Sequence, residues 1–233
     1  MKLLGVLGGM SWESTAHYYR LINRMVRERV GGQSSARLAL WSVDFGPMAK
    51  RIGADDWEPI RTELMDASKR LADAGAGALV IATNTMHRFA DDIEAASGLR
   101  LIHIADVTAK ALARLKVRRP LVLATRPTME TDFYLDRLRA HGLDPVIPEP
   151  GERLALNAII FDELVQGVFT DASRDYVLDA AKTAWARDSI DSVILGCTEF
   201  GLLTPPELFR TPAVDTTEAH CEAAVDWLLS PDP

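Results

Sequence analysis

Two tripeptides in this chain carry residue types that can move a proton. The sequence CTE at residues 197–199 ends one apolar run, and TNT at residues 83–85 ends another. A thiolate is a base and a nucleophile, whereas a hydroxyl can donate or relay a proton. The spacing between Cys197 and Thr83 is close to half of the 233-residue chain. The pattern therefore indicates two related proton-transfer positions, one in each half.

The position of Cys197 between a predicted strand and a predicted helix adds a second argument. Free N–H groups and the positive end of the helix dipole favour anions at a helix start, so we expect a lowered pKa for this thiol and an adjacent site for a carboxylate. A buried free cysteine more commonly serves as a small apolar side chain. The matched tripeptide in the other half favours function for Cys197, whereas Cys221, within a helical pattern, is expected to be core.

Other motifs point away from several reaction classes. Gly8-Gly9 does not match the dinucleotide fingerprint and predicts a tight turn that a ligand can approach. Patterns typical of zinc sites and of serine nucleophile elbows are absent from the sequence, so neither a metal site nor a serine nucleophile is implied. His87 and His220 show no visible partner and are expected in surface or helix-cap roles.

The elements that must position these groups alternate between strand and helix. Apolar runs predict strands at 3–7, 38–43, 78–82, 101–104, 121–124, 145–147 and 192–196. Helical spacing predicts helices at 14–27, 57–74, 129–141, 152–167, 172–186 and 216–229. A further predicted helix follows the strand at 101–104 and ends near residue 115. Such alternation is typical of parallel βαβ units with helices on both faces.

The two halves repeat each other, since each begins with a strand that enters a polar loop and later presents one of the two tripeptides. We therefore predict an α/β fold of two pseudo-symmetric lobes, each a mostly parallel sheet flanked by helices, with the active site in the cleft between them. The predicted lobes are residues 1–116 and 117–233, with a linker at 118–120. The last helix of the first lobe could pack on the other lobe.

The amino-acid composition argues against nucleic acids and membranes as partners. The formal net charge of −7 argues against a nucleic-acid surface. Two cysteines in a chain of this length indicate a reduced, cytoplasmic protein, and no apolar run is long enough for a membrane span.

Taken in order, several motifs resemble the aspartate/glutamate racemase family. They are GVLGGMSWESTAHYYRLIN, GGQSSA, SVDF, ATNTMH, ATRPTMETDFY, GCTEF and AVDTTEAH, spread from Gly5 to His220. The resemblance implies two α/β lobes, activity without pyridoxal phosphate or metal, and a homodimer.

Members of this family commonly use two cysteines, one per lobe, on opposite faces of the substrate α-carbon. Cys197 matches the second-lobe cysteine, whereas Thr83 stands where the first-lobe cysteine is normally found. With a threonine at this position, the chain resembles a subgroup of the family that prefers L-aspartate and L-glutamate. The resemblance therefore implies that Cys197 removes the α-proton and that the Thr83 side returns a proton to the opposite face.

The same resemblance implies a set of substrate-binding residues for a small acidic amino acid or dicarboxylate. These are Met10, Gln33, Arg51, Asn84, Thr85, Thr125, Thr128, Thr198 and Glu199. Arg51 is the first choice for the cation that meets the substrate side chain, and Arg126 is the second. The segment FDELVQG (161–167) departs from relatives that carry a tyrosine and a lysine thereabouts, which leaves the substrate open.

Two alternatives remain at this point. A decarboxylase or isomerase of the same fold could use a single cysteine to protonate one face of a carbanion. A catalytically weak dicarboxylate-binding protein would keep the anion-binding turns without turnover, because a threonine hydroxyl is a poor base.

Overall fold

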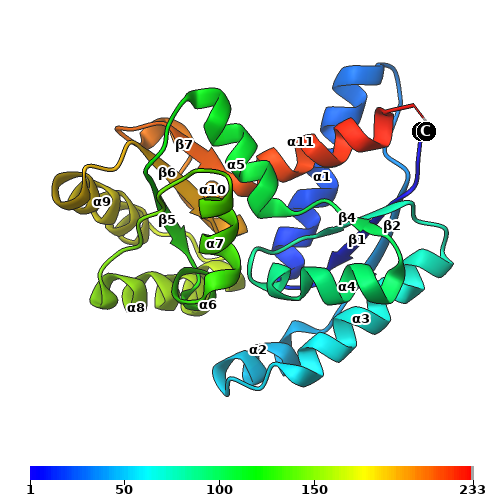
Figure 1. The fold of residues 1–233 in the computed structure, drawn as a ribbon, viewed down its shortest axis with the longest axis horizontal. Helices are drawn as coiled ribbons and strands as arrows, with labels where there is room; N and C mark the ends of the chain where they lie inside the picture. The colour runs from blue at the N-terminus through cyan, green and yellow to red at the C-terminus, as the bar shows by residue number, and fades with distance from the viewer. Residues whose placement is uncertain (232–233) are drawn as a thin grey trace. The chain divides into compact units, whose positions relative to one another are not determined.

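The computed structural model describes residues 1–231, which form two compact units (Figure 1). Unit 1 comprises Met1–His103 together with the C-terminal segment that begins at His220, and unit 2 comprises Ile104–Ala219. Each unit is built on a parallel sheet flanked by helices. The predicted α/β class is therefore confirmed.

Unit 1 contains a four-stranded parallel sheet. Its strands, in order across the sheet, are β2 (Leu38–Ser42), β1 (Leu4–Gly8), β3 (Ala78–Ile81) and β4 (Arg100–Leu101). Its helices are α1 (Trp12–Val30), α2 (Phe45–Gly53), α3 (Glu58–Asp73), the 3₁₀ helix η1 (Thr85–Phe89) and α4 (Ala90–Ser97). Strands β1 and β3 are buried along their whole length, as expected for central parallel strands covered on both faces.

Local sequence explains where α1 begins and ends. Ser11 caps its first turn by accepting a hydrogen bond from the Ser14 amide at 3.2 Å. Gly31 follows its last residue with a φ of +85°, a conformation that favours glycine. The apolar face of α1 buries Tyr18 and Ile22 completely.

Unit 2 contains a three-stranded parallel sheet of β5 (Pro120–Ala124), β6 (Ser192–Gly196) and β7 (Ala213–Asp215), in that order. Its helices are α5 (Ile104–Leu115), α6 (Arg126–Glu130), α7 (Asp132–Ala140), α8 (Pro150–Ala158), the π-helical turn η2 (Ile159–Glu163), the 3₁₀ turns η3 (Leu164–Gln166) and η4 (Pro206–Leu208), α9 (Asp171–Asp188) and α10 (Thr198–Leu203). Helix α11 (Thr216–Leu229) begins in unit 2 and continues into unit 1.

The two sheets share one connectivity, as the internal repeat predicts. Strand β1 lies between β2 and β3, and β5 lies between an isolated bridge at Val146 and β6. Strands β3 and β6 therefore occupy equivalent places. Thr83 follows β3 and Cys197 follows β6, so the two tripeptides stand at corresponding positions in their own sheets.

Several features differ from the sequence expectation. Residues 145–147 form only one bridge, between Val146 and Leu121, rather than a strand. Strand β7 was not predicted, because it has three residues of which only Val214 is buried. The units also divide at 103/104 and 219/220 rather than at 116/117. Helix α5 belongs to unit 2 because Ala109 and Leu112 join a core cluster with Tyr134 and Leu138.

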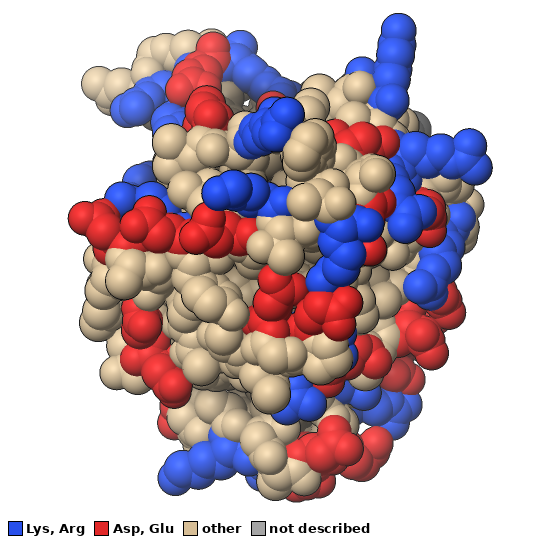
Figure 2. Space-filling view, turned by 90° about the vertical axis from the view of Figure 1, so that its left-hand side faces the viewer, with Lys and Arg blue, Asp and Glu red and all other residues tan. Residues whose placement is uncertain are grey.

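The surface carries both signs of charge. On the face shown in Figure 2, lysine and arginine side chains are interspersed with aspartate and glutamate. No helix within residues 1–231 has both the length and the apolar character that a membrane crossing requires.

Candidate active site

Cys197 lies at the junction of β6 and α10, where it caps the helix with an extended backbone conformation. Its thiol donates a hydrogen bond to Oε2 of Glu199 at 3.1 Å. The Thr198 hydroxyl donates to the same oxygen at 2.6 Å. All three residues are buried, so one carboxylate oxygen receives two hydrogen bonds away from bulk water. The tripeptide therefore brings a thiol, a hydroxyl and a carboxylate into one buried hydrogen-bonded group.

The expectation of a lowered Cys197 pKa is wrong. Burial raises the pKa of this thiol well above its usual value, and the negative charge of Glu199 raises it further. Backbone N–H groups of Glu199 and Phe200 act in the opposite direction but do not overcome burial. The resting group is a thiol, and Glu199 is the acceptor already in contact with its proton.

Glu199 was predicted to bind substrate, and the structure places its carboxylate on Cys197 and Thr198. Sequence reasoning could not supply this contact, because a side chain two positions along from a cysteine can point to either side of a helix start. The only available signal was the adjacency of thiol and carboxylate in the motif.

Two further predicted residues lie at the same edge of the unit 2 sheet. Thr125 follows β5, the neighbour of β6, and the pairing of Ala124 with Gly196 sets Thr125 and Cys197 one residue beyond a matched pair. The hydroxyls of Thr125 and Thr128 lie 3.0 Å apart, and the Thr128 amide donates to the Thr125 carbonyl at 3.0 Å. Unit 2 thus gathers the predicted residues Thr125, Thr128, Cys197, Thr198 and Glu199 at one sheet edge.

The two candidate cations differ in their surroundings. Arg126, the second choice, forms an ion pair with Glu130 at 3.0 Å, and Glu130 also contacts Arg153 at 2.9 Å. Arg126 therefore already has a carboxylate partner within unit 2, which it shares with Arg153. Arg51 lies half-buried in the last turn of α2, in unit 1.

In unit 1, the TNT tripeptide leads from β3 into η1. Thr83 is half-buried, and Asn84 and Thr85 are buried. The ring of His87 turns back over this segment, with Nδ1 at 2.8 Å from the Thr83 carbonyl oxygen. The His87 amide donates to the Asn84 carbonyl at 3.1 Å. One residue therefore closes the turn with both its ring and its backbone.

The expected surface or cap roles of His87 and His220 are wrong, since their exposed fractions are 2% and 0%. His220 contacts the hydroxyl of Tyr18 and the carbonyl of Ile102, residues that are distant in sequence. The immediate sequence around His87, TNTMHRFA, gave no signal of this burial. Cys221 is fully buried, as predicted.

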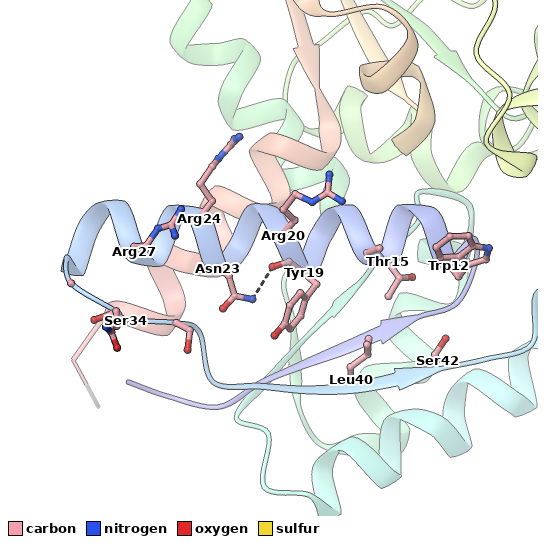
Figure 3. A pocket seen from close by; sticks show the side chains of 14 residues that line it. Trp12, Thr15, Tyr19, Arg20, Asn23, Arg24, Arg27, Ser34, Leu40 and Ser42 are labelled. Carbon is pink, nitrogen blue, oxygen red and sulfur yellow. Dashed lines mark hydrogen bonds between the residues drawn. The ribbon is translucent and has the colours of Figure 1, made fainter.

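The remaining predicted residues lie apart in unit 1. Met10 follows β1 and is buried in the core cluster that contains Val43 and Met48. Gln33 is exposed and lines an open groove of about 1230 Å³ between α1 and β2. Figure 3 shows the side chains of this groove, among them Trp12 and Tyr19.

The Gly8-Gly9 turn is tight, as predicted, but the group that lies close to it is the backbone of Val43. Gly9 has a φ of +94°, and a Cβ there would lie 2.3 Å from the Val43 carbonyl oxygen. Within residues 1–231, no group of three or more His, Cys, Asp or Glu side chains is arranged to hold a metal ion.

The sequence and the fold of this chain are similar to those of known proteins. Residues 7–224 match the family model described as Asp/Glu/hydantoin racemase. A candidate Asp/Glu racemase from Yersinia pestis is 43% identical, with a TM-score of 0.89 over 99% of this chain and 100% of that one. An aspartate racemase homologue from Pyrococcus horikoshii is 30% identical, with a TM-score of 0.85 over 99% and 100%.

A curated relative agrees with these structures. The broad specificity amino-acid racemase of Bacillus subtilis is 20% identical over 98% of this chain and 99% of its own length. The family match spans nearly the whole chain, including both tripeptides. The chain therefore belongs to the Asp/Glu/hydantoin racemase family and is an isomerase.

Proposed function

We propose that this enzyme racemises acidic amino acids, with L-aspartate and L-glutamate as first substrates. Cys197 removes the α-proton, and the Thr83 side supplies a proton to the opposite face. The single observation that carries the proposal is the 3.1 Å contact between the Cys197 thiol and the Glu199 carboxylate. It supplies both a proton-transfer group and an acceptor for the proton that must leave that group.

The proton balance follows from this contact. Glu199 takes the thiol proton and becomes a carboxylic acid, leaving a thiolate on Cys197. The thiolate takes the substrate α-proton, which restores the thiol and leaves a carbanion. The Thr83 hydroxyl, or a water that it holds, gives a proton to the opposite face. The proton on Glu199 then passes through solvent to the Thr83 side and replaces the proton given to the substrate. No net proton is consumed.

The carbanion requires stabilisation at the substrate carboxylate. Donors preorganised where charge develops are the largest contribution that a protein can make to such a step. We assign this role to the hydroxyls and backbone N–H groups of the two tripeptides, together with Thr125 and Thr128. Arg51 is assigned to the substrate side-chain carboxylate.

The thiol also explains the expected asymmetry between enantiomers. A thiol has a pKa of about 8.5 in solution and an aliphatic hydroxyl one far higher, so Cys197 forms its basic anion far more readily than Thr83 does. Removal of the proton from the L enantiomer is therefore expected to be faster than removal from the D enantiomer by the Thr83 side. Cofactor independence, a homodimer and a cytoplasmic location belong to the same proposal.

The test is enantiomer-resolved turnover of L- and D-aspartate and L- and D-glutamate, with α-proton exchange followed by NMR in deuterated water. C197A is expected to lower both racemisation and exchange from the L enantiomer by about 10²-fold or more. C221A is the matched control and is expected to retain activity. Equal initial rates from both enantiomers would contradict the asymmetric scheme.

Other outcomes identify the alternatives. Binding of L-aspartate without exchange would indicate a dicarboxylate-binding protein. Release of carbon dioxide from a substituted malonate, with no exchange of amino acids, would indicate a single-cysteine decarboxylase.

A further inference from the structure

Unit 1 contains a buried cluster of three histidines and a tyrosine, which we call the histidine cluster: Tyr18, His87, His103 and His220. The ring centroids of His87 and His103 lie 4.7 Å apart, and those of His87 and His220 lie 5.5 Å apart. Tyr18 meets His220 edge to face at 5.7 Å. The exposed fraction of each side chain is 6% or less. Such a concentration of imidazole groups in a core demands an explanation, because buried polar groups are costly unless they are hydrogen-bonded.

The partners of His220 define its proton position. Its Nε2 lies 2.6 Å from the carbonyl oxygen of Ile102, which can only accept, so Nε2 carries the proton. Its Nδ1 lies 2.9 Å from the Tyr18 hydroxyl and therefore accepts from it. Both nitrogens are satisfied in the neutral form, and the ring is fixed at two ends.

The same reasoning applies to His87. Its Nδ1 lies 2.8 Å from the carbonyl oxygen of Thr83, so Nδ1 carries the proton and donates. Its Nε2 is buried, with no hydrogen-bond partner among residues 1–231, and it holds the lone pair. Orientation of the ring thus depends on the Thr83 contact at one end and on the packed rings of His103 and His220.

Electrostatics keep this donor neutral. Burial, and then the neighbouring histidines, hold the pKa of His87 well below its usual value, and burial lowers that of His220 to about 4. At neutral pH the histidine cluster is therefore uncharged. A neutral ring of fixed orientation is suited to holding a backbone rather than to exchanging protons with a substrate.

We propose that His87 is a positioning residue that holds the Thr83 turn through its Nδ1–H, with the rest of the histidine cluster holding His87. This inference rests on the proposed function, in which the Thr83 side delivers the second proton. A geometric error at a proton-transfer group is costly, because the hydroxyl must lie within hydrogen-bond reach of the reacting carbon. Loss of the Nδ1–H contact should therefore affect one half of the reaction only.

The experiment compares H87N and H87L. The amide nitrogen of asparagine occupies a place close to that of Nδ1 and can donate to the Thr83 carbonyl, whereas leucine cannot. We expect H87L to lower kcat for racemisation of L-aspartate by about tenfold, the factor that corresponds to one lost hydrogen bond, with KM unchanged. Cys197-dependent α-proton exchange from L-aspartate should stay within about threefold of wild type. H87N should recover most of the racemisation.

Several results would overturn the inference: H87L racemising as fast as wild type, H87N failing alongside H87L, or exchange and racemisation falling together. A readout that needs no turnover is the ¹⁵N NMR of the wild-type His87 ring, which must show the proton on Nδ1. A proton on Nε2 would refute the contact. If the wild type neither exchanges nor racemises, the proposed function fails, while the ring tautomer still decides whether His87 holds the turn.

Discussion

Cys197 and Glu199 form a thiol–carboxylate hydrogen bond at the start of α10, with Sγ and Oε2 3.1 Å apart. The contact has two opposed effects. The charge on Glu199 raises the pKa of the thiol, which disfavours the thiolate. In the proposed mechanism, the same carboxylate accepts the thiol proton when the thiolate forms. The carboxylate thus has two roles, since it raises the thiol pKa and provides a proton acceptor, and a substitution can separate them.

The substitution E199Q separates them. A neutral amide removes the charge that raises the Cys197 pKa, so we expect faster alkylation of Cys197 by iodoacetamide at a given pH, quantified by peptide mass spectrometry. Loss of the proton acceptor should lower racemisation by about tenfold or more. E222Q, at an exposed glutamate, is the control and should change neither rate. Slower alkylation in E199Q would argue against a thiol governed by Glu199.

The substitution T83C tests the asymmetry between the two proton-transfer positions. A thiol is far more acidic than a threonine hydroxyl, so a cysteine at residue 83 should be a better base toward the D enantiomer. We expect T83C to raise the initial rate from D-aspartate by about tenfold or more, with a smaller change from L-aspartate. T83V, which has a similar shape but no hydroxyl, should lower both directions. An unchanged L-to-D rate ratio in T83C would oppose the role of Thr83.

The buried ring of His220 predicts acid sensitivity. Burial lowers its pKa from 6.5 to about 4 in the folded chain, so the unfolded chain binds more protons between these values. Stability from this group is therefore complete above pH 6.5 and is lost as the pH falls toward 4, by up to about 3 kcal/mol. H220Q should flatten this loss in urea unfolding measured across that range. An equal loss of stability in H220Q and in the wild type would exclude His220 as its source.

Asp215, at the end of β7, predicts a pH dependence of the opposite sign. Burial raises its pKa from 3.8 to about 6, so the folded chain binds more protons between these values. Its contribution falls as the pH rises through that window, by up to about 3 kcal/mol. D215N keeps an acceptor for the Thr217 amide, and we expect its stability relative to wild type to increase from pH 4 to pH 6. D175N, at an exposed aspartate, should show no such trend.

The turn after β1 predicts that a methyl group added at Gly9 lowers the stability of the fold strongly. In G9A, the new Cβ would lie 2.3 Å from the Val43 carbonyl oxygen and the residue would keep a φ of +94°. We expect a loss of about 3 kcal/mol or more in the free energy of unfolding. Gly98 also has a positive φ, but its Cβ would meet nothing within 4 Å. G98A should therefore cost only about 1 kcal/mol, and equal losses in the two variants would show that the Val43 contact is unimportant.

The sequence predicted the elements that have a strong local signature. Continuous apolar runs identified β3 and β6, and helical spacing identified α11 with its observed bounds. The near-repeat of the two tripeptides identified equivalent places in the two sheets. Strand β7 escaped because one buried side chain, Val214, is too short a signal for a period.

The site was predicted less completely, because its decisive contacts join residues that no local pattern connects. The strand–turn pattern correctly placed Thr83 after β3 and Cys197 after β6, but the direction of the Cys197 pKa shift depended on burial and on where the Glu199 side chain points. The environment of His87 depended on His220, which lies more than half the chain away in sequence. Periodicity reports which face of an element is buried and gives no information on which side chain it meets.

The chain passes from unit 1 to unit 2 at residues 103/104 and returns at 219/220. Unit 2 is thus a single uninterrupted segment, whereas unit 1 is assembled from two pieces that flank it. During synthesis, the ribosome releases β1 to β4 long before the segment that supplies His220. Of the two rings that pack against His87, that of His220 therefore arrives last. If His87 positions the Thr83 turn as proposed, that turn acquires its complete support only after the intervening segment has emerged.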